Sequence, residues 1–294
     1  MRVARTIAAV RAEVAGARAA GQTVALVPTM GAFHAGHEAL MAAARESSDL
    51  VVVSLFVNPT QFDRPADLAD YPRVEDEDAV TAERAGADVL FAPAVEAMYP
   101  PGFATMISVS GISEVLEGAH RPGHFAGVTT VVAKLLNIVT PDVAWFGAKD
   151  AQQLLVVRRL VADLDLPVRI EALDTVREPD GLALSSRNRR LSPDDRERAR
   201  ALPEALAAAA DAVRRGERDP GAVEARARAA CASRVRLEYM AVVDPYTLAP
   251  PARIEGPVLV AAAAHVGSVR LIDNLLVAPS AASPLPVPPP EEIA

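Results

Sequence analysis

The chain has 294 residues, of which 51% are hydrophobic, and 30 basic against 38 acidic residues give a net charge of −8. This length allows one large domain or two smaller ones, and the acidic balance argues against a nucleic-acid-binding protein, which needs a concentrated basic face. No apolar run approaches the roughly 18–20 residues of a membrane span. The single cysteine, Cys231, excludes an internal disulfide framework and a cysteine-ligated zinc site. We expect a cytoplasmic protein that binds neither nucleic acid nor a membrane.

The first part of the chain predicts an α/β fold. Val3, Ile7, Val10 and Val14 recur at steps of four and three, which indicates an amphipathic helix at the N-terminus rather than a signal peptide. Strand-like and helix-like segments then alternate to about residue 175. The strand-like segments are 23–28, 50–57, 88–91, 142–146 and 167–173, and the helical ones are 36–46, 126–138 and 151–164. This alternation predicts a Rossmann-like, doubly wound parallel sheet over residues 1–175, with ligands at the carboxyl ends of its strands.

After residue 175 the pattern changes to that of a smaller α+β domain, residues 176–278. Ser192 followed by Pro193 is a good helix start, and helical stretches reach to about Arg215 and from Pro220 to Arg234. Three strand-like runs follow at 237–243, 258–263 and 269–277, which favour a small antiparallel sheet. Residues 279–294 hold six prolines and predict a disordered tail.

The first motif that could carry chemistry is PTMGAFHAGH, residues 28–37, between the first strand of the sheet and the following helix. His34 and His37 share one face of a helical turn. The N–H groups of a helix start attract phosphate, and glycine lets the backbone approach a ligand closely. The imidazoles could donate to phosphate oxygens whose charge grows in a transition state. The alternatives are two histidines that only cap the helix, or a metal site, for which no third ligand is evident nearby.

Two further motifs follow other strands of the sheet. VNPTQF, residues 57–62, places the amides of Asn58 and Gln61 at the ligand-binding edge, where amides hold hydroxyls and carboxylates without adding charge; the alternative is a simple Asn-Pro turn. FGAKDAQQ, residues 146–153, places Lys149 where a phosphate would sit, with Asp150 as a helix cap or ribose ligand. Only two of the 30 basic residues are lysines, which favours a specific role for Lys149 over a solvated surface charge.

Two last stretches lie near the expected pocket. VREPDGLALSSRN, residues 176–188, offers two hydroxyls and an arginine as an anion clamp, although a polar linker would look similar. GAHRPGHF, residues 118–125, is either part of the pocket lining or a structural loop.

Taken together, these motifs resemble those of the pantothenate synthetase (pantoate–β-alanine ligase) family, in the nucleotidyltransferase-like Rossmann superfamily that also holds the class I aminoacyl-tRNA synthetases. The resemblance runs from about residue 3 to 277. PTMGAFHAGH, VNPTQF, RPGHFAGVTTVVAKL, FGAKDAQQL and TVREPDGLALSSRN occur in the family's order. The HxGH motif alone is only moderately specific, whereas the ordered set is highly specific.

The resemblance implies roles for matching positions. His37 would be the proton donor, His34 its phosphate-binding companion, and Lys149 a contact of the phosphates, which makes these three the catalytic set. Pantoate would be held by Gln61 and Gln153, with Gln61 also near β-alanine. The implied ATP-binding residues are Met30, Gly31, Ala32, Phe33, His34, Ala35, Gly36, His37, Gly147, Ala148, Lys149, Asp150, Val176, Leu184, Ser185, Ser186 and Arg187. Phe33, Ala35 and Ala148 depart from the usual Leu, Glu and Glu, which puts only the tuning of affinity in doubt.

The resemblance also implies the reaction. ATP and pantoate would form pantoyl-adenylate and pyrophosphate, and β-alanine would then give pantothenate and AMP, with Mg²⁺ alongside ATP and a homodimer as the assembly. The runner-up is another adenylyltransferase of the superfamily, which would need a second basic phosphate site where Gln61 and Gln153 suggest a neutral, hydroxyl-bearing carboxylate. A non-catalytic Rossmann module is disfavoured by the intact His34, His37, Lys149 and Arg187. A tRNA synthetase is disfavoured by the acidic balance.

Overall fold

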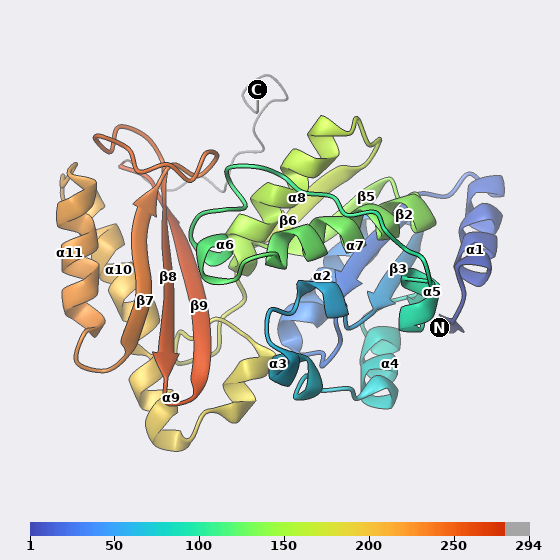
Figure 1. The fold of residues 1–294 in the computed structure, drawn as a ribbon, viewed down its shortest axis with the longest axis horizontal. Coiled ribbons are helices and arrows are strands. Elements are labelled where there is room, and N and C mark those ends of the chain that lie inside the picture. Colours follow the sequence, from blue (N-terminus) through green and yellow to red (C-terminus); the bar gives the residue numbers. More distant parts are fainter. Residues whose placement is uncertain (280–294) are drawn as a thin grey trace. The chain divides into compact units, whose positions relative to one another are not determined.

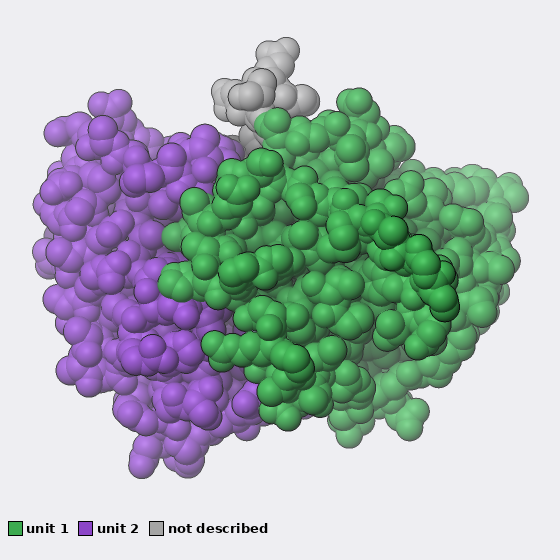
Figure 2. All heavy atoms as spheres, viewed as in Figure 1, with its two compact units in different colours: residues 1–148, 152–174 green, residues 149–151, 175–294 purple. Residues whose placement is uncertain are grey.

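The computed structural model describes residues 1–279 and divides the chain into two compact units (Figure 2). The first unit comprises residues 1–148 and 152–174, and the second comprises residues 149–151 together with the chain from Thr175 onward. The short segment from Lys149 to Ala151 therefore groups with the second unit, although its neighbours on both sides belong to the first. The tail predicted for residues 279–294 lies outside the described residues apart from Pro279.

The first unit is built on a six-stranded parallel sheet with the strand order β1-β4-β3-β2-β5-β6 (Figure 1). Short β-branched and apolar runs form its central strands, which are buried on both faces as parallel strands are. The strands are β1 (Arg2–Ala4), β2 (Val24–Thr29), β3 (Leu50–Leu55), β4 (Val89–Phe91), β5 (Val143–Gly147) and β6 (Arg169–Leu173).

Helices cover both faces of this sheet. The larger core lies between the sheet and α1 (Ile7–Ala19), α7 (His124–Val139) and α8 (Ala151–Asp163), and a smaller core lies between the other face and α2 (Ala35–Ser47) and α4 (Glu75–Arg84). Short helices complete the unit: η1 (Pro59–Gln61), α3 (Pro65–Ala69), α5 (Val95–Met98), α6 (Glu117–His120) and η2 (Ala148–Asp150).

The strand order identifies where a ligand is expected to bind. From β2 the chain runs to β3 and β4 on one side, and β5 and β6 follow on the other side. The direction reverses between β2 and β5, and ligands of open α/β sheets bind at the carboxyl ends of the strands at such a switch point. The loop after β2 ends at His34, the N-cap of α2, and His37 lies in the first turn of that helix, so this motif leaves the sheet at the expected position.

The second unit packs two helices against one face of a three-stranded antiparallel sheet, β7-β8-β9. Alanines and leucines of α10 fill the space between helix and sheet, and the buried Cys231 belongs to the same core. The elements are η3 (Ser186–Arg190), α9 (Pro193–Ala199), α10 (Ala201–Arg214), α11 (Pro220–Cys231), β7 (Arg236–Val243), β8 (Val258–Val266) and β9 (Val269–Val277).

The predicted fold class is confirmed, with one correction at the N-terminus. The expected helix does not include Val3: residues Arg2–Ala4 form the edge strand β1, which pairs with β4, and Val3 is 46% exposed. The helix begins only at Ile7, where the Thr6 hydroxyl accepts the N–H of Ala9 at 3.1 Å. The Ser192 cap is present as predicted, and its hydroxyl accepts the N–H of Asp195 at 3.1 Å.

Candidate active site

His34 and His37 cap helix α2 and fix each other. His34 is the N-cap, and its Nδ1 accepts the N–H of Gly36 at 3.2 Å, while Nδ1 of His37 accepts the N–H of His34 at 3.3 Å. The two ring centroids lie 4.2 Å apart. Because each Nδ1 is an acceptor, each neutral imidazole carries its proton on Nε2. The capping arrangement therefore turns both histidines into Nε2–H donors, so capping and ligand binding are compatible roles.

A buried carboxylate holds the loop between β2 and α2. Asp78 of α4 is 2% exposed and accepts the N–H groups of Ala32 at 2.8 Å and Phe33 at 2.7 Å. Ala32 has a φ of 54°, a left-handed conformation that costs a non-glycine residue free energy. Gly31 has a φ of 90°, and a Cβ there would lie 2.7 Å from Asp78 Oδ2. The backbone N–H groups of Ala32 and Phe33 are therefore used to hold the loop.

Replacing Asp78 by Ala should destabilise the first unit by about 2–4 kcal/mol, because two buried N–H groups lose a charged acceptor. The expected result is a lower midpoint of urea unfolding together with a raised KM for ATP. Glu77→Ala is the matched control, since Glu77 is an exposed carboxylate on the same helix. Equal stability of the two variants would contradict a loop-holding role for Asp78.

Gln61 lies at the end of η1, after β3, and is buried with its side chain directed at the loop after β2. Its Nε2 donates to the sulfur of Met30 at 3.1 Å, which brings together the motifs that follow β2 and β3. Its backbone carbonyl accepts Nδ1–H of His124 at 2.8 Å and Nη2 of Arg121 at 3.3 Å. The stretch 118–125 therefore positions Gln61, while His120 in the same stretch is exposed.

Arg121 is itself held by an acidic partner. Its Nε lies 3.2 Å from Asp63 Oδ1. Burial alone would raise the pKa of Asp63, but its own backbone N–H and the Arg121 guanidinium outweigh burial and lower that pKa. Asp63 therefore stays charged near neutral pH, and its contact keeps Arg121 against the backbone of Gln61.

The two adjacent glutamines of α8 have different roles. Gln152 is buried, and its Nε2 donates to the carbonyls of Ile112 and Val115 at 2.8 Å each. Gln152 therefore anchors the loop before α7. Gln153 is half-buried on the first turn of α8. It is the glutamine of this pair that the sequence predicts to hold pantoate.

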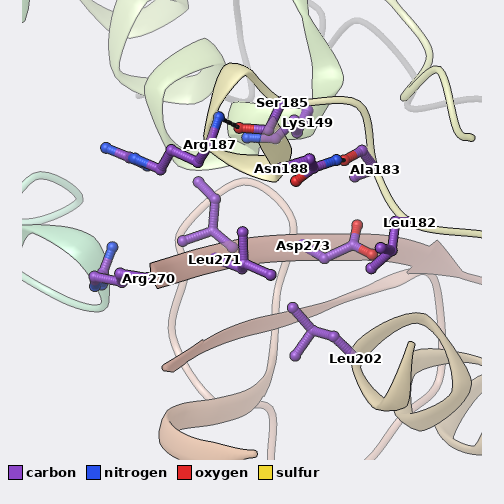
Figure 3. Close-up of a pocket in the computed structure, with 11 residues that line it drawn as sticks. Lys149, Leu182, Ala183, Ser185, Arg187, Asn188, Leu202, Arg270, Leu271 and Asp273 are labelled. Carbon is purple, nitrogen blue, oxygen red and sulfur yellow. Dashed lines mark hydrogen bonds between the residues drawn. The ribbon is translucent and has the colours of Figure 1, made fainter. Parts of the chain in front are cut away.

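In the second unit the structure brings Lys149 together with the loop of residues 176–188. Lys149, Ser185 and Arg187 line one pocket, and Figure 3 shows these three on one side of it, with Leu202 and Leu271 on the other. The Lys149 carbonyl accepts Nδ2 of Asn274 at 2.7 Å, and Lys149 Nζ lies 3.7 Å from Asp150 Oδ2. Two cations and a hydroxyl on one wall suit an anionic ligand.

The loop of residues 176–188 is held within the second unit by partly buried polar contacts. Arg177 donates to both carboxylate oxygens of Asp273, at 2.8 and 3.0 Å. Asn188 donates to Glu178 Oε1 at 2.7 Å and to the Ala183 carbonyl at 3.0 Å, and Arg196 pairs with Glu178. The hydrogen bond to Glu178 raises the pKa of Arg196. Leu184 donates its N–H to the carbonyl of Val176 at 2.9 Å, which fixes the turn that presents Ser185 and Arg187.

Several residues that support the site were missed by sequence reasoning. Asp78 stands in an acidic run that looks like an ordinary helix start, and Glu178 and Asn188 look like loop residues. Tyr99 was missed as well; with four tyrosines in the chain, the scarcity argument used for Lys149 could have singled it out.

Comparison with known proteins agrees with the fold and identifies the family. The family model described as pantoate-beta-alanine ligase matches residues 2–276. The pantothenate synthetase of Cereibacter sphaeroides is 55% identical over 274 residues, covering 93% of this chain and 98% of that protein. The crystal structure of pantothenate synthetase from Thermus thermophilus has a TM-score of 0.88 and 45% identity, covering 94% of this chain and 99% of the other.

A third similar protein has been solved with ligands. The pantoate-beta-alanine ligase of Francisella tularensis, complexed with beta-gamma ATP and beta-alanine, has a TM-score of 0.77 and 34% identity, covering 95% of this chain and 100% of the other. The present chain belongs to the pantoate–β-alanine ligase family. It is accordingly an enzyme that ligates pantoate to β-alanine, and the activity predicted from the sequence is confirmed. Among residues 1–279, no helix is long and apolar enough to cross a membrane.

Proposed function

We propose that this chain uses ATP to activate pantoate as pantoyl-adenylate. In the first step a pantoate carboxylate oxygen attacks the α-phosphorus, and the bond to the bridging oxygen of pyrophosphate breaks. In the second step the amine of β-alanine attacks the acyl carbon, the bond to AMP breaks, and the amine releases a proton. The observation that carries the proposal is the pair of imidazoles whose Nδ1 atoms are occupied as acceptors, which makes both rings Nε2–H donors.

His34 and His37 are proposed to act on the α-phosphate. In the transition state the attacking and leaving oxygens are both partly bonded to the α-phosphorus, and the equatorial oxygens of the α-phosphate gain negative charge. Fixed N–H donors stabilise this charge without reorganising, which is the usual source of a large rate effect. Since α2 and the loop held by Asp78 fix both rings, the donors are in place before ATP binds. His37 is the proposed proton donor and His34 the second phosphate contact.

Lys149, Ser185 and Arg187 are proposed to bind phosphate oxygens of ATP and of the leaving pyrophosphate. They share one wall of the pocket in the second unit, and the compact ammonium and the planar guanidinium both match phosphate. The rest of the proposed ATP-binding set comprises Met30, Gly31, Ala32, Phe33, Ala35 and Gly36 of the first motif, together with Gly147, Ala148, Leu184, Ser186 and the backbone of Val176. Asp150, beside Lys149, is the proposed partner of a ribose hydroxyl.

Mg²⁺ is proposed to accompany ATP. Among residues 1–279 no three His, Cys, Asp or Glu side chains cluster as a metal cage. We therefore propose that the ion is held mainly by phosphate oxygens of ATP and keeps several of its water ligands. The ion would neutralise part of the phosphate charge.

Gln61 and Gln153 are proposed to bind pantoate, with Gln61 also near β-alanine. Neutral amides orient hydroxyls and a carboxylate while leaving the carboxylate nucleophilic, whereas a close arginine pair would damp its nucleophilicity.

The family resemblance further supports a homodimer. The single buried cysteine is compatible with a cytoplasmic location. Sedimentation equilibrium would test the dimer.

The proposed function is tested by asking which carboxylic acid substrate is needed for pyrophosphate release. Purified protein with ATP, Mg²⁺ and β-alanine should release pyrophosphate only when pantoate is added, and pantothenate and AMP should appear in equal amounts. A phosphorylated co-substrate in place of pantoate should give no release. Release with the phosphorylated compound but not with pantoate would replace this proposal by that of a different adenylyltransferase.

A further inference from the structure

A buried polar network lies behind Gln61, and its centre is Asn58. Asn58 is 1% exposed, and its Nδ2 donates to Gln61 Oε1 at 3.0 Å and to the Gly127 carbonyl at 3.1 Å. Its Oδ1 accepts the hydroxyls of Tyr99 at 2.8 Å and Thr60 at 2.9 Å. Both donors and both acceptor positions of the Asn58 amide are therefore used within the protein. Asn58 acts by holding its neighbours and not by binding substrate itself.

This network determines which end of the Gln61 amide faces the site. Since Oε1 accepts from Asn58, Nε2 is directed the other way and meets the sulfur of Met30 at 3.1 Å. A thioether is a weak acceptor, so a carboxylate or hydroxyl oxygen of a ligand would be the better partner. The network thus presents Gln61 as a donor.

The close approach of α7 makes this arrangement possible. A Cβ at position 127 would lie 2.3 Å from the Thr60 carbonyl, so only glycine lets η1 lie against α7. The Gly127 carbonyl then accepts from Asn58. The identity of residue 127 therefore fixes the distance between α7 and the strand end that carries Gln61.

Tyr99 is held rigidly from its other side. Its ring meets Phe103 edge-on at 5.1 Å and Phe56 at 6.1 Å, and the ammonium of Lys134 lies 4.8 Å from the Phe103 ring and 5.9 Å from the Tyr99 ring. Lys134 is one of the chain's two lysines. Burial raises the pKa of the Tyr99 phenol, and the smaller effect of the Thr60 hydroxyl does not reverse this. The phenol therefore remains a donor throughout the neutral range.

We propose that Tyr99 is a positioning residue of the pantoate subsite, which acts through Asn58 to direct the amide N–H₂ of Gln61 at a pantoate oxygen. This inference rests on the proposed role of Gln61 in binding pantoate. Without the phenol hydroxyl, Oδ1 of Asn58 loses its shortest hydrogen bond, so the Asn58 amide can shift and its hydrogen bond to Gln61 Oε1 weakens. A Gln61 amide that is held less firmly would direct its N–H₂ at the pantoate oxygen less precisely.

Tyr99→Phe tests the proposal, because it keeps the ring and its contacts with Phe103 and Lys134 and removes only the hydroxyl. The KM for pantoate should rise about five- to tenfold, as expected for one lost hydrogen bond, while the KM for ATP stays within about twofold. Tyr246→Phe, in the second unit, is the matched control and should change neither constant. An unchanged pantoate KM, or an equal rise of both constants, would overturn the positioning role.

A second readout does not depend on the identity of the substrate. In a ¹⁵N spectrum of the substrate-free protein, the side-chain amide resonance of Gln61, assigned by its absence in Gln61→Glu, should shift or broaden in Tyr99→Phe and not in Tyr246→Phe. An unmoved resonance would refute the relay from Tyr99 to Gln61. If the wild-type protein does not use pantoate, the proposed function fails by itself, and the spectrum still decides whether Tyr99 orients Gln61.

Discussion

His37→Ala should slow pyrophosphate formation from ATP and pantoate by about 10²–10³-fold, the usual loss for one preorganised transition-state donor. The Nδ1 atom of His37 accepts the N–H of His34, so its Nε2–H is fixed in direction by helix α2 itself. The KM for ATP should change much less than kcat, because the contact strengthens only as charge develops on the α-phosphate. Single-turnover measurements of pyrophosphate release provide the test.

The control for His37→Ala must separate catalysis from capping. His37→Gln keeps a side chain of the type that completes a capping box, so it should recover most of the thermal stability lost in His37→Ala but little of the rate. His120→Ala, at an exposed position on α6, should leave the rate unchanged. Near-normal pyrophosphate release by His37→Ala would remove His37 from the mechanism.

Lys149→Ala should raise the KM for ATP and slow the first step, with a combined loss in kcat/KM of about 10²-fold or more. The Lys149 side chain is only 18% exposed, its carbonyl accepts Nδ2 of Asn274, and Lys149 lines the same pocket as Ser185 and Arg187. Lys149→Arg should recover activity only in part, since a planar fork does not replace a compact ammonium. Steady-state kinetics with varied ATP would measure both variants.

The matched control for Lys149 is Arg190→Ala. Arg190 is an exposed cation in η3, the same short helix that holds Arg187, so its removal changes the net charge by the same amount without touching the pocket. A similar loss in Arg190→Ala would mean that general electrostatic attraction, and not a specific contact, explains the effect. Full activity in Lys149→Arg would likewise argue against a specific lysine.

Local patterns were sufficient to predict most of the fold. The runs at β2, β3 and β9, the Ser192 cap and the change of pattern near residue 175 depend on neighbours within a few positions. The edge strand β1 was missed because three residues, Arg2–Ala4, become a strand only by pairing with β4. That pairing partner lies far along the chain. The spacing of four residues between Val3 and Ile7 also fits a helix, so the local pattern favoured the wrong element. The helices between η1 and α7 were also not predicted individually.

The residues of the candidate site likewise fall into those that local motifs predict and those that only tertiary contacts reveal. His34, His37, Gln61 and Lys149 follow strand ends and stand out by residue type, so the sequence alone singled them out. Asp78 could not be found, since its carboxylate meets the Ala32 N–H across 46 positions of sequence. Tyr99 reaches Asn58 across 41 positions. The residues proposed to bind ligands are visible in motifs, whereas the residues that hold them in place depend on tertiary packing.

The central claim is that adenylation of pantoate precedes and does not require β-alanine. A rapid-quench experiment with labelled ATP, Mg²⁺, pantoate and no β-alanine tests it most directly. The account predicts a burst of pyrophosphate equal to the concentration of active sites, together with enzyme-held pantoyl-adenylate that is converted to pantothenate and AMP when β-alanine is added. No burst, while the complete mixture turns over normally, would contradict the adenylate-first order and require a concerted mechanism with all three substrates bound.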